Sequence, residues 1–366
     1  MGFKTGIIGL PNVGKSTLFN ALTKTALAQA ENFPFCTIEP NVGEVGVPDQ
    51  RLEILSDIAN SKVVVPAKMS FYDIAGLVKG ASEGEGLGNQ FLANIRECDA
   101  IIHVLRCFDD SEITHVLGSV DPIRDLEIIN TELMLADLQS IEKQLLSLEK
   151  KANSGDKSVS PLVKLLNKIE TSLGAGEYLT IDNFDSDEQL LLKNVQLLTL
   201  KPTLYVCNLD ENSTQNGNSH SNIVKSYALK QNAVSVNISA SIEQEISLIK
   251  DRKDQEFFMS ELGLERTGLD KLILEGYKLL GLMTFFTAGP KETRAWTIRT
   301  NTTAPKAGRV IHTDFEKGFI RAEVISYDDY VKNAGEQGAK EEGKLRSEGK
   351  EYIVKDGDVI NFLFNV

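Results

Sequence analysis

The chain has 366 residues with 39 Lys and Arg against 52 Asp and Glu, which gives a formal net charge of −13. Hydrophobic residues make up 42% and charged residues 25%, as is usual for a globular protein, and the length allows two or three domains. Residues 283–366 hold 13 basic and 13 acidic residues, so the whole negative balance precedes residue 283. This acidic body excludes a protein that coats nucleic acid through bulk charge.

No apolar run approaches the roughly 18 residues of a membrane span, and the N-terminus leads into a predicted strand rather than a signal peptide. The four cysteines are scattered, without a C-x-x-C pair, at Cys36, Cys98, Cys107 and Cys207. Such spacing argues against a zinc site or a disulfide framework. We therefore expect a cytoplasmic protein with no membrane contact, and a monomer.

The first predicted element is a strand at 5–10, followed by a glycine-rich loop and a helix that opens at 17–24. Residues 9–17 read GLPNVGKST and match G-x-x-x-x-G-K-[ST], the P-loop that surrounds the phosphates of a nucleotide. Lys15 would supply charge to the β- and γ-phosphates, and the Ser16 hydroxyl would ligate Mg²⁺. We expect the nucleotide to contact Pro11, Asn12, Val13, Gly14, Lys15, Ser16 and Thr17.

Short apolar runs then alternate with helical stretches, a pattern typical of βα units and a parallel sheet. Further strands are predicted at 69–74, 100–107, 204–207 and 233–238. The predicted strand at 69–74 leads into Asp73-Ile74-Ala75-Gly76, which matches D-x-x-G. Asp73 would hold a metal-bound water, the Gly76 N–H would approach the γ-phosphate, and Thr37 in the loop at 32–37 would be a further Mg²⁺ ligand.

Many switch GTPases place a glutamine directly after D-x-x-G to orient the attacking water. This chain has Leu77 there, and a leucine cannot position water. Intrinsic hydrolysis is therefore expected to be slow.

Two apolar helical stripes interrupt the α/β pattern. Leucine and isoleucine recur at spacings of three and four over 135–148 and again over 162–173, with a polar break at 153–156. Ser186 and Gln189 resemble a capping box before a third helical stretch at 189–200. The pattern predicts a helical hairpin inserted between strands, either as padding of the domain or as an arm that docks a partner.

The last segment has alternating runs typical of strands at 295–299, 318–324, 352–354 and 359–366. The charged stretch at 340–350 is expected to be a loop or a short helix. We predict a small α+β domain.

Three long sequence segments carry a family resemblance: NFPFCTIEPNVG, DIAGLVKGASEGEGLGNQFL and HTDFEKGFIRAEV. Through them the chain resembles the YchF family, the Obg-like ATPases of the Obg-related branch of translation-factor GTPases. The resemblance covers essentially the whole chain. It implies a P-loop G domain at 1–128 and 201–282, a coiled-coil helical insertion at 129–200 and a β-grasp-like TGS domain at 283–366. It also implies a ribosome-associated regulator that hydrolyses nucleotide and prefers ATP over GTP.

Guanine is normally selected by N-K-x-D at a strand end, but residues 208–211 read NLDE. Leu209 replaces the lysine, and Glu211 replaces the aspartate with a longer side chain that moves the carboxylate out of register. A missed buried hydrogen bond costs about 1–3 kcal/mol, so guanine loses its selective contact. By the resemblance, Leu209 would contact adenine through its backbone, with Asn208 and Glu211 shaping the base site. Residues 239–241 are a second candidate edge of the base pocket.

The chain has four histidines, and one of them is a candidate for catalysis. By the resemblance, His115 would orient the attacking water, although by residue type alone it is a surface-loop histidine. His103 falls inside an apolar strand and is expected in the core. Three functions stay open: a slow ATP-hydrolysing switch that binds a ribosomal particle, a conventional GTPase, and a nucleotide-stabilised module whose TGS domain contacts RNA or protein.

Overall fold

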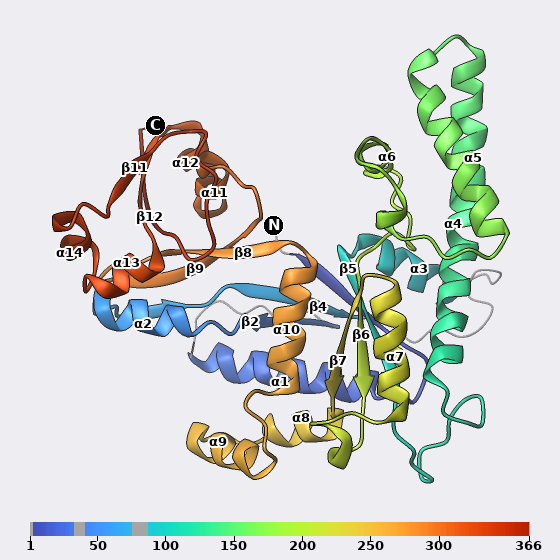
Figure 1. Cartoon of the computed structure of the whole chain (residues 1–366), viewed down its shortest axis with the longest axis horizontal. Helices are drawn as coiled ribbons and strands as arrows, with labels where there is room; N and C mark the ends of the chain where they lie inside the picture. Colours follow the sequence, from blue (N-terminus) through green and yellow to red (C-terminus); the bar gives the residue numbers. More distant parts are fainter. Residues whose placement is uncertain (1–2, 33–40, 75–86, 366) are drawn as a thin grey trace.

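The computed structural model describes residues 3–32, 41–74 and 87–365, and Figure 1 shows two sheets with their helices and a projecting helical arm. The elements before the arm are β1 (Lys4–Ile8), α1 (Lys15–Asn32), β2 (Val42–Gly46), α2 (Gln50–Ala59), β3 (Val63–Val65), β4 (Lys68–Asp73), α3 (Leu87–Glu97) and β5 (Ala100–Arg106). The arm contains α4 (Pro122–Asn153), η1 (Lys157–Val159), α5 (Ser160–Gly174), η2 (Ile181–Asn183) and α6 (Ser186–Leu192).

Two groups of elements follow the arm. The first comprises β6 (Thr203–Asn208), η3 (Glu211–Ser213), α7 (Ser219–Lys230), β7 (Val234–Ile238), α8 (Ala240–Ile246), α9 (Arg252–Glu261) and α10 (Gly268–Leu279). The second comprises β8 (Leu282–Thr287), β9 (Glu292–Arg299), α11 (Ala304–Ile311), α12 (Thr313–Lys317), β10 (Phe319–Ile325), α13 (Tyr327–Lys332), α14 (Glu336–Glu341), β11 (Arg346–Glu348) and β12 (Val359–Phe364).

The first sheet has the strand order β2-β4-β1-β5-β6-β7; β2 runs antiparallel to β4, and the other neighbours are parallel. The predicted α/β class is confirmed, and the five predicted strands lie in one sheet. All seven residues of β5 are buried: α4 and α10 pack against this strand, and α1, α3 and α7 pack against its neighbours β1 and β6. β2 was not predicted, because its sequence VGEVG has two glycines and little strand character.

The carboxyl ends of β1, β4 and β6 meet at one edge of this sheet, where parallel α/β sheets bind their ligands. The P-loop follows β1, Asp73 ends β4, and Asn208 ends β6. The fold thus brings three predicted site segments together from distant parts of the sequence.

The arm is a helical hairpin, as predicted. α4 begins beside β5 and α7, continues away from the sheet, and pairs with α5 after the polar turn (Figure 1). Its core contains Ile141, Leu145, Leu165, Leu166, Ile169 and Leu173. One member of the predicted stripe, Leu135, is instead exposed.

The third helix of the arm differs from the prediction. The capping box is formed by Asp185 and Glu188 rather than by Ser186 and Gln189, because the Asp185 carboxylate accepts the Glu188 N–H at 2.9 Å and Glu188 accepts the Asp185 N–H at 3.2 Å. α6 ends at Leu192 rather than continuing to residue 200. The buried Asp137 carboxylate accepts the N–H groups of 198 and 199, which directs the chain back to β6.

The second sheet has the order β11-β10-β12-β8-β9-β3. β12 runs parallel to β8, and α11 and α12 cover β10 and β12, which is the arrangement of a β-grasp domain with its own core. Two local predictions were wrong. Residues 352–354 form a single bridge between Ile353 and Thr303 rather than a strand, and the stretch at 340–350 contains β11, which pairs with β10.

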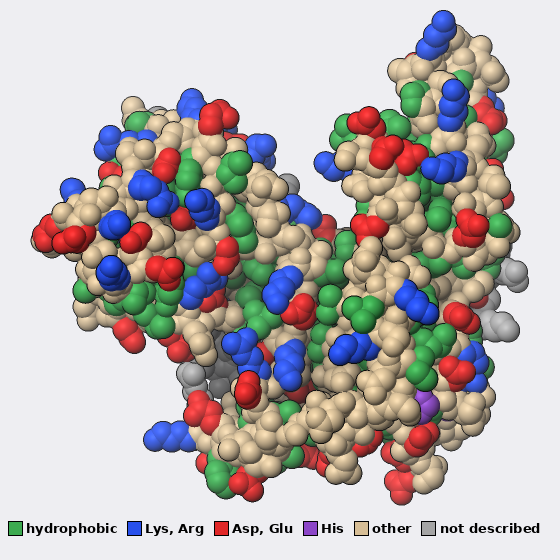
Figure 2. Space-filling model, viewed as in Figure 1, with side chains coloured by type: hydrophobic (Ala, Val, Ile, Leu, Met, Phe, Trp, Pro, Cys, Tyr) green, Lys and Arg blue, Asp and Glu red, His purple; other side chains and the backbone are tan. Residues whose placement is uncertain are grey.

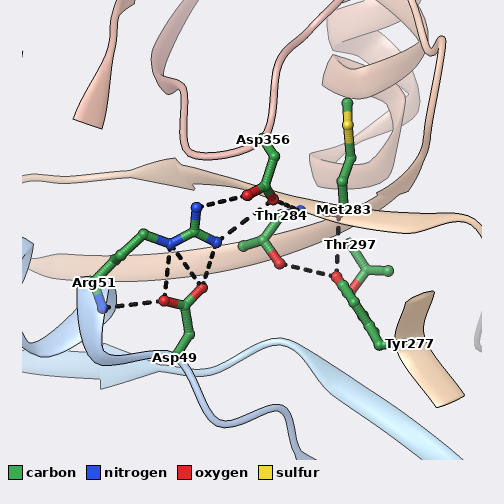
Figure 3. A network of polar contacts seen from close by, with 7 residues as sticks. All are labelled: Asp49, Arg51, Tyr277, Met283, Thr284, Thr297 and Asp356. Atoms are coloured by element: carbon green, nitrogen blue, oxygen red, sulfur yellow. Dashed lines mark hydrogen bonds and ion pairs between the residues drawn. The ribbon is translucent and has the colours of Figure 1, made fainter. Parts of the chain in front are cut away.

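The two sheets are joined by β3, which leaves the first domain and pairs in parallel with β9 at the edge of the second sheet. Beside it lies a polar cluster of Asp49, Arg51, Thr284 and Asp356, here called the interdomain cluster (Figure 3). Arg51 contacts one carboxylate from each domain: its Nη2 lies 2.7 Å from Asp49 of the first domain, and its Nη1 lies 2.7 Å from Asp356 of the C-terminal domain. Asp356 also accepts the N–H of Thr284 at 2.9 Å, so one arginine connects α2 to two segments of the C-terminal domain.

No helix among the described residues combines the length and apolar character needed to cross a bilayer.

Candidate nucleotide-binding site

A cavity of about 1030 Å³ opens at the carboxyl edge of the first sheet. Ligand pockets are commonly about 300–1,000 Å³, so the space accommodates a nucleoside triphosphate. The lining residues are Leu10, Pro11, Asn12, Gly14, Lys15, Ser16, Thr17, Asp73, Phe108, Asp109, Asp110, Ile113, Asn208, Leu209, Asp210, Glu211, Asn212, Ala240 and Ser241.

The P-loop has the geometry that its sequence requires. Gly14 has φ +91°, and a Cβ there would meet the Asn208 amide nitrogen at 2.1 Å, so only glycine fits. Asn12 also has a positive φ, 63°, which asparagine tolerates, and its amide donates to the Thr114 carbonyl at 3.1 Å. The loop then enters α1, whose first N–H groups suit an anion.

Lys15 and Asp73 form an ion pair inside the cavity, and both side chains are largely buried. Ser16 lines the same cavity one residue further along α1. The hydroxyl and the carboxylate are hard oxygen donors of the kind that Mg²⁺ prefers, so the residues present fit that ion.

Asn208 connects the P-loop to the base end of the cavity. Its amide nitrogen donates to the Val13 carbonyl at 2.9 Å, and its amide oxygen accepts the Ala240 N–H at 2.9 Å. Because both ends of the amide are occupied by protein, Asn208 holds β6, α8 and the P-loop together at this end of the cavity.

Leu209 and Glu211 both line the cavity after β6. The Leu209 N–H donates to the Ile238 carbonyl at 2.8 Å, so a backbone contact from Leu209 to a base would use its carbonyl oxygen. The segment at 239–241 contributes Ala240 and Ser241 to the opposite edge.

Val13 is not one of the cavity-lining residues. Its side chain is buried in the core cluster of the first domain, and only its backbone takes part in the loop. The predicted ligands Gly76 and Thr37, together with Leu77 and Cys36, lie outside the described residues.

His115 is buried rather than a surface histidine, and it does not line the cavity. Its Nε2 lies 2.8 Å from the Asp125 carboxylate, and its Nδ1 accepts the Leu117 N–H at 3.1 Å. Both ring nitrogens are thus occupied within the protein. His103 lies in the core as expected, and burial lowers its pKa to about 3.

One part of the cavity lining was not predicted from the sequence; it is formed by Phe108, Asp109, Asp110 and Ile113 in the loop after β5. These residues match no motif. The one available signal was their place directly after a strand of a parallel sheet, where ligand-binding loops occur.

Two family models match the chain. The model described as 50S ribosome-binding GTPase (MMR_HSR1) covers residues 4–151, and YchF-GTPase_C, described as a protein of unknown function (DUF933), covers residues 282–365. Relatives named ribosome-binding ATPase YchF include those of Haemophilus ducreyi and Bacillus subtilis, which are 55% and 49% identical over 100% of both chains.

Solved structures agree with these matches. The Schizosaccharomyces pombe YchF GTPase has a TM-score of 0.89 at 38% identity and covers 99% of this chain and 98% of its own. A GTP-binding protein from Pyrococcus horikoshii OT3, with a TM-score of 0.62 at 18% identity, supports the fold alone. The P-loop geometry, the full-length identity and the shared fold together show that this chain belongs to the YchF family of P-loop nucleotide-hydrolysing enzymes.

Proposed function

We propose that this protein is a ribosome-associated switch that binds ATP with Mg²⁺ in preference to GTP and hydrolyses it slowly. The observation that carries this proposal is the segment 208–211, NLDE, at the base end of a cavity that also holds the P-loop. Leu209 and Glu211 stand where a guanine-selecting lysine and aspartate would be needed. The ATPase and ribosome-binding names of full-length relatives support the same proposal.

In the phosphate half of the site, Lys15 is proposed to exchange its ion pair with Asp73 for the β- and γ-phosphates. This exchange frees the Asp73 carboxylate to hold Mg²⁺, together with the Ser16 hydroxyl and, on sequence grounds, Thr37. When bound, Mg²⁺ neutralises charge on the phosphate oxygens.

Slow hydrolysis follows from Leu77, which cannot orient water. Gly76 is proposed to contact the γ-phosphate. His115 is proposed to orient the water, which requires its hydrogen bond with Asp125 to open and the loop after β5 to rearrange. Thr114 already contacts Asn12 of the P-loop, so the required displacement starts next to the phosphates.

The test is calorimetric titration with non-hydrolysable ATP and GTP analogues in the presence of Mg²⁺. Tighter binding of the ATP analogue is expected, and tighter binding of the GTP analogue would reject the interpretation of Leu209 and Glu211. The variant Lys15→Ala should abolish binding of both analogues. Unchanged affinity in that variant would reject the site itself.

The proposed ribosome association predicts that the protein, acting as a cytoplasmic monomer, sediments with ribosomes in a nucleotide-dependent manner. The TGS domain, proposed at 283–366, is a candidate RNA contact. Its surface carries interspersed Lys, Arg, Asp and Glu in the view of Figure 2, so it would recognise RNA by local contacts rather than by bulk charge.

A further inference from the structure

The largest fully buried side chain of the described residues is charged: Arg106, the last residue of β5, is 1% exposed. Burying an ionised group is costly unless hydrogen bonds compensate for the lost water. Within the described part of the chain, the guanidinium hydrogen bonds go to main-chain carbonyls rather than to a carboxylate. Nε donates to Phe108 at 3.1 Å, Nη1 to Ile113 at 2.9 Å and Nη2 to Asp110 at 3.1 Å.

All three carbonyls belong to the loop at 108–113, whose residues Phe108, Asp109, Asp110 and Ile113 line the cavity together with the adjacent segment 208–212. A planar guanidinium has donors in fixed, divergent directions, so it can hold three carbonyls at once. The guanidinium carbon also lies 4.6 Å from the centre of the Phe108 ring. One buried cation therefore contacts both the backbone and the aromatic side chain of this wall.

The loop lies between β5 and the start of α4 without regular structure. Among the described residues, backbone–backbone hydrogen bonds occur at Cys107 before it and at Gly118 after it. Its other polar contacts are local or exposed: the Glu112 N–H donates to the Asp110 carboxylate at 2.8 Å, and His220 lies 3.9 Å from the exposed Asp109 carboxylate. Its far end is attached to the P-loop through Asn12 and the Thr114 carbonyl. The loop is thus fixed at one end by the phosphate-binding segment and along its length by Arg106.

We propose that Arg106 is a positioning residue for the nucleoside end of the cavity. Its guanidinium holds residues 108–113 so that Phe108 and Ile113 form an apolar wall against the base, together with Leu209 of the adjacent loop. This rests on the proposed function, because the ligand must be a nucleoside triphosphate. Arg106 touches no ligand itself; it acts through the loop.

The proposal separates two parts of the binding free energy. The phosphates depend on the P-loop, which Arg106 does not contact, whereas the base depends on the wall that Arg106 shapes. Removing the guanidinium should weaken binding of ATP and leave binding of inorganic tripolyphosphate, which lacks a base, unchanged.

The experiment compares Arg106→Met and Arg106→Lys with the unaltered full-length chain, by calorimetric titration with a non-hydrolysable ATP analogue and with tripolyphosphate, both with Mg²⁺. In Arg106→Met we expect affinity for the ATP analogue to fall by about tenfold or more, the scale of a lost stacking contact, with tripolyphosphate affinity within about twofold. Arg106→Lys should give a smaller loss of the same kind, because an ammonium group cannot hold three divergent carbonyls. In steady-state hydrolysis, KM for ATP should rise and kcat should change little.

A matched control is Arg124→Met. Arg124 also fixes the segment between β5 and α4, but through Ser119 and Asp125, away from the cavity. Its ATP affinity should stay within about twofold of the unaltered protein.

Three outcomes would overturn the proposal: unchanged ATP affinity in folded Arg106→Met, an equal loss of ATP and tripolyphosphate affinity, or failure of both Arg106 variants to fold. The last would make Arg106 a residue of core stability alone. Failure of the proposed function would give a different result. The unaltered chain would then bind the ATP analogue no more tightly than it binds tripolyphosphate.

Discussion

Three side chains that line or border the nucleotide cavity bind other parts of the protein: Asn208, Asn12 and Arg106. Asn208 joins the P-loop to β6 and α8, Asn12 joins the P-loop to the loop after β5, and Arg106 holds that loop. The hydrogen bonds of Asn208 are buried and therefore costly to leave unmade. At the scale of single residues, the site is built by side chains that fix the backbone around the cavity.

His115 gives the first prediction at this scale. In His115→Ala we expect kcat for ATP to fall at least about tenfold, within the range of general-acid–base and water-orienting effects, with unchanged affinity for the ATP analogue. The apparent Tm should fall too, because Asp125 loses a buried partner at 2.8 Å. A lower Tm with unchanged kcat would show that His115 only anchors its loop.

Glu243 gives a prediction of pH dependence. Burial raises its pKa to about 7, although it accepts N–H hydrogen bonds from Gly268 and Leu269 at the start of α10. Because the folded state favours the protonated form, its contribution to stability is present below pH 4.5 and is lost as pH rises through about 7. Apparent Tm should therefore fall less steeply between pH 5 and 8 in Glu243→Gln than in the unaltered chain.

Glu245→Gln is the matched control for this measurement, because Glu245 lies on the same helix with an exposed side chain. Its Tm profile should follow that of the unaltered protein. Identical slopes in all three proteins would contradict the assignment to Glu243.

At the scale of elements, the hairpin of α4 and α5 is stabilised by its own apolar seam rather than by the sheet. Leu166 of α5 is fully buried in this seam, whereas Leu146 of α4 is 63% exposed. Leucine-to-alanine changes at buried sites cost about 2–5 kcal/mol, because a cavity adds to the lost transfer free energy.

We therefore expect Leu166→Ala to speed amide hydrogen exchange and proteolytic cleavage in the arm, with ATP hydrolysis retained because the arm's seam is separate from the cavity. Leu146→Ala is the control and should leave the exchange of the arm unchanged. Equal effects of the two substitutions would mean that the seam does not stabilise the arm.

At the scale of the whole molecule, the C-terminal domain is attached through the edge pairing of β3 with β9, through the interdomain cluster (Figure 3), and through apolar residues such as Phe286 and Tyr330 that join the core cluster of the first domain. The arm and the C-terminal domain stand apart above the first domain, and the notch between them is visible in Figure 2. These contacts together hold the C-terminal domain in its place relative to the arm. The domain boundary proposed at residue 129 falls inside α4, so the arm continues rigidly from a helix of the first domain.

Arg51→Ala should loosen this attachment. It would leave the Asp49 and Asp356 carboxylates facing each other without the shared guanidinium, at a cost of about 1–3 kcal/mol. We expect faster proteolysis between the domains and a larger radius of gyration by small-angle X-ray scattering. The control Arg309→Ala removes a more exposed pair with Glu316 on the C-terminal domain and should change neither.

Local sequence was sufficient for the P-loop, the five strands of the first sheet and the hairpin stripes, because glycine spacing and apolar periodicity act within a few residues. It also placed Asp73 at a strand end, and Lys15 and Leu209 in segments that follow strands, which parallel topology brings to one edge. The capping box at Asp185 and the early end of α6 were missed, because the hydrogen bonds of Asp185, Glu188 and Asp137 decide them.

Tertiary structure alone decided the contacts of Arg106, the burial of His115 and the pairing of β3 with β9. Arg106 bonds backbone carbonyls, which have no residue signature, and His115 is buried against Asp125 in the first turn of α4. β3 and β9 lie far apart in the sequence. The chain by itself thus determined the nucleotide chemistry and the family, since both reside in contiguous motifs. Only the folded molecule decided which loop after β5 lines the cavity and how the two domains are joined, because those contacts exist only once the sheets have assembled.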